Sequence, residues 1–132
     1  MNKSASDFDP STANPQTSPW PNRLTWGVQI SLALAFGAAG GSKLIGVTPM
    51  VDLFDLIGLG QWFRYVTGAI EVGSAVLLLN VRSSWIGASL LICTMFGAVI
   101  VHIVVVPSPP IGPLVLGTLS AIVLFRRRPR AF

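Results

Sequence analysis

The sequence predicts an all-α membrane protein, a bundle of four transmembrane helices with a short interfacial helix between the first and the second. Three observations support this fold class. The chain of 132 residues is 52% hydrophobic and 11% charged, whereas a soluble domain carries about 25% charged residues. The charged residues lie in short zones between long apolar runs. Those runs do not alternate with polar residues and are about twice as long as a barrel strand, so helices are expected.

The chain divides into one membrane domain and two tails. Residues 1–22 contain several prolines among Ser, Thr, Asn and Asp and lack the apolar core of a signal peptide. We therefore expect a disordered cytoplasmic tail there. Residues 23–126 are expected to form the four-helix domain, and residues 127–132 a basic cytoplasmic tail.

Four apolar segments are expected to cross the bilayer, which takes about 20 helical residues. They comprise residues 24–45, 63–80, 85–106 and 111–125. The fourth segment is short for a full span, so we expect it to extend through Arg126. The connections at residues 81–84 and 107–110 are so short that the helices they join must be antiparallel neighbours.

The longer connection, residues 46–62, is expected to hold the interfacial helix. Thr48 is a candidate N-cap, Pro49 suits a first helical position, and Gly58 and Gly60 would end the helix. Apolar residues recur at a spacing of three to four: Met50, Leu53, Phe54 and Ile57. Asp52 and Asp55 would share the polar side. The alternative is an amphipathic loop.

With four spans, both chain ends face the same side of the membrane. Most basic residues fall on that side: Lys3, Arg23, Arg82, Arg126, Arg127, Arg128 and Arg130. Lys43 and Arg64 fall on the other side. This excess predicts cytoplasmic termini. Arg82 and the cluster at residues 126–130 would be topology anchors that contact membrane lipid, and nucleic acid is not an expected partner.

Small residues at a spacing of four predict closely packed helix faces. These residues are Gly37, Gly41, Ala69, Gly73, Ser89, Cys93, Gly97, Gly117 and Ala121. They indicate a compact bundle and carry no chemistry of their own.

Ionisable residues inside spanning segments are costly, and they are therefore candidates for function. The topology places four of them in the outer half of the bundle: Lys43, Arg64, Glu71 and His102. Facing inward, they would form one polar cluster beneath the interfacial helix. Asp52 and Asp55 would lie near the mouth of that cavity.

Each member of this cluster has a structural alternative. Glu71 is either a proton acceptor or head-group anchor in an apolar cavity, or one half of an interhelical ion pair. Lys43 either joins it or extends to the outer headgroups, and Arg64 is expected to be an interfacial anchor. The only histidine, His102, is expected to pack or to bond to Glu71 rather than bind metal or haem. The only cysteine, Cys93, is expected to be a small packing residue.

Three runs carry a resemblance to a known family: AFGAAGGSKLIG, MVDLFDLIGLGQWFRYVTGAIEVGSAVLLL and GAVIVH. In the first, a Gly-rich helix end precedes Lys43 and Leu44. In the second, Phe54 and the Gly58–Leu59 pair precede a ladder formed by Arg64, Gly68 and Glu71. The chain thereby resembles the DoxX-like family of small bacterial four-helix membrane proteins. It departs from the family at Gly60, where a proline often follows the Gly-Leu pair.

The resemblance implies a subunit of a redox assembly in the bacterial inner (plasma) membrane. The family takes its name from a subunit associated with a terminal quinol oxidase and with thiosulfate:quinone oxidoreduction, and other members are linked to oxidoreductase complexes that handle oxidative stress. We therefore expect an accessory subunit with quinone as the candidate ligand, and a redox partner protein or a second copy as partner. One Cys, one His and no nucleotide-binding motif predict no intrinsic metal or cofactor. The alternatives are a non-enzymatic module that binds or transports a small lipophilic or protonatable solute, and a purely structural protein.

Overall fold

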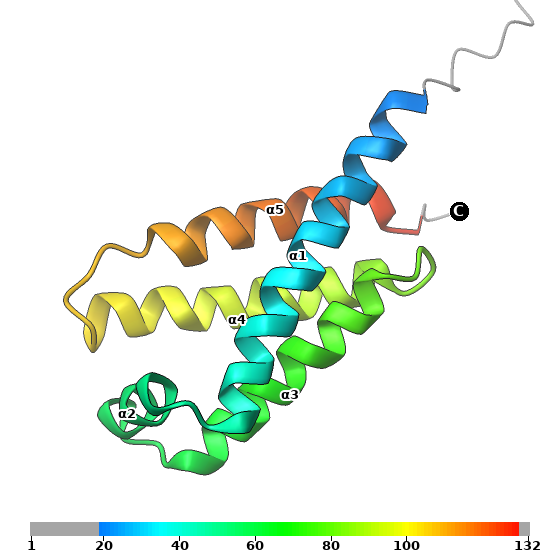
Figure 1. The fold of residues 1–132 in the computed structure, drawn as a ribbon. Helices are drawn as coiled ribbons and strands as arrows, with labels where there is room; N and C mark the ends of the chain where they lie inside the picture. The colour runs from blue at the N-terminus through cyan, green and yellow to red at the C-terminus, as the bar shows by residue number, and fades with distance from the viewer. Residues whose placement is uncertain (1–18, 130–132) are drawn as a thin grey trace, which may run out of the picture.

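The computed structural model describes residues 19–129, which form five helices and no strand (Figure 1). The helices are α1 (Pro19–Ile45), α2 (Thr48–Ile57), α3 (Gln61–Leu78), α4 (Ser84–Val104) and α5 (Ile111–Arg127). The all-helical class is thus confirmed, as is the order of four long helices with a short one after the first. Among the described residues, two helical stretches are long and apolar enough to cross a membrane, Asn22–Ile45 and Ser84–Val104. The four-span bundle therefore stays a prediction.

The long helices pack as neighbouring pairs. α1 packs most extensively on α3, α4 runs beside α5, and α3 packs on α4. The short α2 contacts α3 and α1 at the end of the bundle where α1 finishes and α3 begins (Figure 1). The C-terminal end of α4 lies toward this same end. Side chains from four helices can therefore meet there.

Helix α1 begins earlier than expected. Its first residue is Pro19 rather than Leu24, so the last four residues of the predicted tail are helical. Prolines fit there because the first N–H groups of a helix have no partner within it. The rest of that tail and the residues after position 129, including Arg130, lie outside the described range. At the other end of the domain, α5 extends to Arg127 as expected.

The predicted interfacial helix is present as α2, which excludes the loop alternative. It begins at Thr48, so the N-cap is Val47 and not Thr48, and no side chain caps it. Pro49 lies in its first turn. Gly58 ends it in the left-handed conformation at φ 79°, where its N–H donates to the Phe54 carbonyl over 3.2 Å. Glycine suits this position because a Cβ atom disfavours positive φ.

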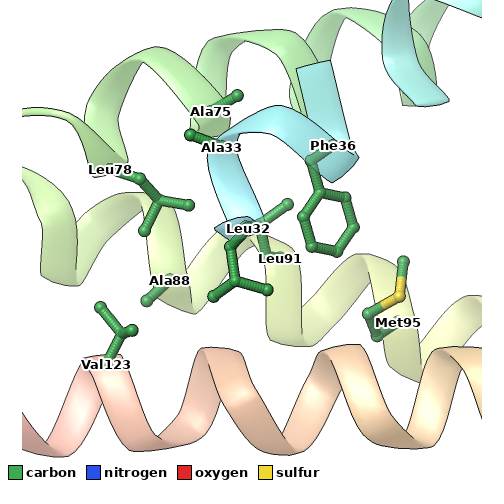
Figure 2. Packing of buried hydrophobic residues seen from close by; sticks show 9 residues of the cluster. All are labelled: Leu32, Ala33, Phe36, Ala75, Leu78, Ala88, Leu91, Met95 and Val123. Carbon is green, nitrogen blue, oxygen red and sulfur yellow. The ribbon is translucent and has the colours of Figure 1, made fainter. Parts of the chain in front are cut away.

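The core lies where α1, α3, α4 and α5 meet (Figure 2). Its buried apolar side chains are Leu32, Ala33, Phe36, Ala75, Leu78, Ala88, Leu91, Met95 and Val123. Fully buried polar side chains accompany them: Gln29, Ser74, Ser84 and Ser120. Of these, Gln29 bonds to another helix, at the Leu78 carbonyl, whereas Ser84 and Ser120 bond to the nearby Val81 and Leu116 carbonyls.

Three glycines, and not the predicted set, allow the closest helix approaches. A Cβ on Gly40 would lie 2.8 Å from the Gly68 carbonyl oxygen, and one on Gly68 would lie 3.0 Å from the Gly40 carbonyl oxygen. Gly87 approaches the Ser74 carbonyl in the same way, at 2.8 Å. By contrast, at several predicted positions an added Cβ would meet no other part of residues 19–129 within 4 Å: Gly37, Gly41, Gly73 and Gly97. The contact face of α1 runs through Phe36 and Gly40, one residue away from the predicted face.

Candidate functional site

Side chains from α1 to α4 line a cavity of about 430 Å³. This volume is within the range of small-molecule sites, which is about 300–1,000 Å³. Most of the lining is apolar: Met50, Leu53, Phe54, Ile57, Phe63, Ile70, Met95, Gly97, Ala98 and Val101. The remaining lining residues are Lys43, Thr67, Glu71, Cys93, Thr94 and His102. The cavity is therefore an apolar slot with a few polar groups.

Lys43 and Glu71 form an ion pair in the cavity wall. The Lys43 Nζ atom donates to Glu71 Oε2 over 2.8 Å, and the two side chains are 14% and 3% exposed. The close approach of Gly40 and Gly68 brings α1 and α3 near enough for this contact, because each glycine lies three residues before one partner. Glu71 is therefore one half of an interhelical ion pair, as one of the two alternatives predicted, and this ion pair lies in the wall of a cavity.

Arg64 lies beside this pair but does not line the cavity. Its side chain is buried, and its Nη1 atom donates to the carbonyl oxygen of Lys43. Its guanidinium also lies 4.3 Å from the centre of the Tyr65 ring. Gly46, with φ 78°, passes next to this guanidinium. Arg64 therefore holds the end of α1 in place, whereas the sequence predicted an interfacial anchor.

Gln61, which sequence reasoning missed, ties α2 to α3. Its Nε2 atom donates to Asp55 Oδ1 over 2.6 Å and to the Val51 carbonyl over 3.1 Å. Its Oε1 atom accepts from Arg64 Nε over 2.6 Å. The only signal in the sequence was a polar residue after the Gly-Leu-Gly turn. Both bonds from Gln61 reach the polar side of α2, at Asp55 and at the Val51 carbonyl. The apolar side of α2 therefore faces the cavity.

Asp52 and Asp55 share the exposed, polar side of α2, as the sequence predicted. Both are exposed, and neither lines the cavity. The cavity wall that α2 contributes is apolar, since it comprises Met50, Leu53, Phe54 and Ile57. Asp55 instead accepts the hydrogen bond from Gln61. The two carboxylates are the solvated side of an amphipathic helix.

His102 and Cys93 line the cavity from α4. His102 is half-buried, and its Nδ1 atom lies 2.8 Å from the Ala98 carbonyl, one turn back in the same helix. It does not bond to Glu71, which leaves packing as the remaining expectation from the sequence. Cys93 is exposed and contributes to the cavity wall, so it is not the packing residue that the sequence predicted.

A second polar network lies at the opposite end of the bundle. The fully buried Gln29 donates from Nε2 to the Leu78 carbonyl over 2.6 Å and accepts from Arg127 Nε over 2.8 Å. The Arg127 guanidinium lies 5.5 Å from the centre of the Trp26 ring. Arg127 was predicted as a topology anchor, and it also joins α5 to α1. The predicted anchors Arg82, Arg126 and Arg128 are exposed.

The cavity offers binding groups rather than a catalytic arrangement. Within residues 19–129, no three His, Cys, Asp or Glu side chains are grouped so as to hold a metal ion. The cavity can donate hydrogen bonds from Lys43 and can accept them at Glu71 and His102. Such a set orients a ligand by its polar atoms while the apolar walls hold the rest of it.

The fold and the site together define a helical bundle with an apolar ligand-sized cavity whose wall contains a buried ion pair. The family model described as the DoxX-like family matches residues 27–123. This match covers more than half of the chain, which therefore belongs to the DoxX-like family, a membrane-associated family. No curated protein and no solved structure matches the chain.

Proposed function

We propose that this protein is a membrane subunit of a quinone-linked or oxidative-stress redox assembly, and that it binds a quinone-type ring in the cavity of α1 to α4. The observation that carries the proposal is the Lys43–Glu71 ion pair in the wall of an otherwise apolar cavity. Quinones combine carbonyl oxygens, which need donors, with an apolar ring and tail. Lys43 supplies the donor, and the apolar walls suit the ring.

The proposal includes four spans with both termini in the cytoplasm of a bacterial cell. Helix α3 supports it because its two charged side chains, Arg64 and Glu71, are 4% and 2% exposed and so would not face lipid. The exposed positions of α3 are largely apolar and aromatic, and they include Trp62, Val66 and Val76. The outer face of α5 is apolar in the same way, at Ile111, Leu114, Val115, Ile122 and Phe125. Both helices thus offer lipid the surface it requires.

A partner would supply the electrons. The whole chain has one cysteine and one histidine, which provide neither a dithiol nor a pair of haem ligands. The chain would accordingly act as the quinone-binding part of an assembly with a redox partner protein or with a second copy. The cavity, and not a cofactor of this chain, would be its contribution.

The position of Cys93 in the cavity wall provides a direct test, because it is the only cysteine. The rate of its alkylation by N-ethylmaleimide is measured in purified protein with increasing decylubiquinone, whose ring is fully substituted. We expect the quinone to slow alkylation at least threefold. Lys43→Met should weaken this protection, whereas Arg82→Met, an exposed site in the α3–α4 connection, should not. An alkylation rate that decylubiquinone leaves unchanged would contradict the proposal.

A second experiment addresses the assembly. The protein is expressed together with its genomic neighbours and purified in mild detergent, and the extract is analysed for quinone by mass spectrometry. Copurifying quinone together with an oxidoreductase subunit is the expected result. A bound lipophilic solute of another class, without any redox partner, would favour the alternative of a binding or transport module.

A further inference from the structure

The cavity contains two hydrogen-bond acceptors without a protein partner. Glu71 uses Oε2 for Lys43, and its Oε1 atom has no hydrogen-bond partner among residues 19–129. The other acceptor is on His102, whose only hydrogen bond within that range is the one from Nδ1 to the Ala98 carbonyl. Both residues line the same cavity, one from α3 and one from α4.

The contact to Ala98 fixes the tautomer of His102. A carbonyl oxygen can only accept a hydrogen bond, so Nδ1 must carry the proton. In the neutral imidazole the other ring nitrogen, Nε2, then has a free lone pair and is an acceptor. The helix backbone thereby presents His102 as an acceptor for whatever occupies the cavity.

The charge in the cavity also restricts the ligand. Lys43 and Glu71 neutralise each other at a distance of 2.8 Å, and no other charged side chain of residues 19–129 lines the cavity. A cationic ligand would therefore lack a counterion, which is costly in an apolar site. A neutral ligand with hydroxyl groups satisfies both acceptors without adding charge.

We infer that the cavity selects the reduced, hydroxyl-bearing form of a quinone-type ring, with His102 Nε2 and Glu71 Oε1 accepting hydrogen bonds from its hydroxyl groups. This inference rests on the proposed function and adds a preference between the two redox forms. The quinone leaves both acceptors unpaired in an apolar site, and an unpaired acceptor without water is unfavourable. The hydroxyl oxygens of the quinol can still accept from Lys43.

The test compares decylubiquinol and decylubiquinone under anaerobic conditions, with protection of Cys93 from alkylation as the readout. We expect the quinol to bind about tenfold more tightly, as two hydrogen bonds imply. The dimethyl ether of the quinol, which has the reduced ring but no hydroxyl donor, should lose this advantage. Equal binding of quinol and quinone would overturn the inference while leaving the proposed function intact, and binding of neither would overturn both.

Variants of His102 assign the preference to its ring. His102→Phe should bind the quinol several-fold more weakly and change quinone affinity less than twofold. His102→Gln has a side-chain carbonyl that can accept in place of Nε2, so it should keep part of the preference. If His102→Phe folds with an unchanged melting temperature and retains the full preference for the quinol, the assignment to His102 is wrong. The comparison of the three ligands on the unaltered protein stands independently of these variants.

Discussion

At the residue scale, Lys43 and Glu71 depend on each other. Each is a charged group largely withdrawn from solvent, and each has the other as its only charged partner within 4.0 Å among residues 19–129. A buried ion pair of this kind contributes little net stability, but removing one partner leaves an uncompensated charge. The pair therefore makes each of its members difficult to replace singly.

We expect Lys43→Met to lower the free energy of unfolding by about 3–5 kcal/mol, because Glu71 is left buried without its partner. The double variant Lys43→Met/Glu71→Leu should recover most of this loss, since an apolar pair suits the surroundings. Denaturant unfolding in detergent, followed by tryptophan fluorescence, measures both. Arg82→Met, an exposed site, is the control. If the single variant, the double variant and the parent protein have equal free energies of unfolding, the ion pair does not contribute to stability as proposed.

The sequence placed Lys43 and Glu71 in one polar cluster but left their pairing as one of several alternatives, and it did not predict the roles of their neighbours. Helix order and length determine the depth of a residue, and depth alone brings Lys43, Glu71 and His102 to one end. Which way a long side chain bends is decided by its contacts. Arg64 could reach either lipid or the α1 carboxyl end, and it bonds to the Lys43 carbonyl. Gln61 was missed because an uncharged amide does not stand out at a helix start.

At the element scale, the contact between α1 and α3 depends on two glycines. Gly40 and Gly68 let the two backbones approach until each would-be Cβ lies about 3 Å from the opposite carbonyl oxygen. Small residues permit such approaches, and α1 packs more extensively on α3 than on any other described helix. Lys43 and Glu71 are one turn beyond these glycines. The spacing of the helices thus determines whether the ion pair can form.

We expect Gly40→Ala to separate α1 from α3 and to lower the free energy of unfolding by about 1–3 kcal/mol, as overpacking does. The reason is that its Cβ would lie 2.8 Å from a backbone oxygen, which cannot move aside. The matched control is Gly41→Ala, the next residue, where a Cβ meets nothing within 4 Å. There alanine should leave stability unchanged or raise it slightly, because it favours helix. Thermal unfolding of the two variants provides the comparison, and equal melting temperatures would contradict the close approach.

Helix α2 depends on Gln61 for its polar contacts to α3. We expect Gln61→Ala to speed amide hydrogen exchange in α2, because the bonds to Asp55 and to the Val51 carbonyl are lost. The rate of amide hydrogen exchange in α4 should not change. Asp52→Ala, which alters an exposed side chain of the same helix, is the control. Mass spectrometry resolves the two helices, and unchanged protection of α2 would show that apolar packing alone holds it.

The elements show where periodicity succeeds and where it fails as a predictor. The spacing of apolar residues predicted α2 correctly because four apolar side chains on one side of a helix are withdrawn from water together. In the structure these four side chains form one wall of the cavity. The pattern of small residues predicted the wrong face of α1, because Gly37, Gly40 and Gly41 permit two faces one residue apart. Only the partner helix selects between them. Residue spacing alone therefore does not determine which face of α1 contacts α3.

At the scale of the whole molecule, the four-span prediction can be compared with a two-span arrangement. A two-span arrangement that uses only α1 and α4 also puts both termini on one side, so the position of the termini cannot distinguish the two. The connections can. With four spans, the α3–α4 connection faces the cytoplasm and the α4–α5 connection faces outward, whereas with two spans these sides are exchanged.

We expect four spans, and single cysteines introduced into a Cys93→Ala background test this in intact cells. A membrane-impermeant maleimide should label Ser108→Cys, in the α4–α5 connection, and should not label Val81→Cys, in the α3–α4 connection. Asp52→Cys, on α2, should be labelled in either arrangement and is the positive control. The reverse pattern for Ser108→Cys and Val81→Cys would establish two spans and remove α3 and α5 from the membrane.

The network at the other end of the bundle has a consequence for how the protein is made. Gln29 lies in α1, which leaves the ribosome before the other described helices, and its acceptor atom is paired with Arg127, which follows 98 positions later. Until α5 has been synthesised, the amide oxygen of Gln29 lacks this partner. The contact between α1 and α5 thus forms only after the helices between them exist, and a chain truncated before Arg127 would keep all of α1 to α4 and still lack this contact.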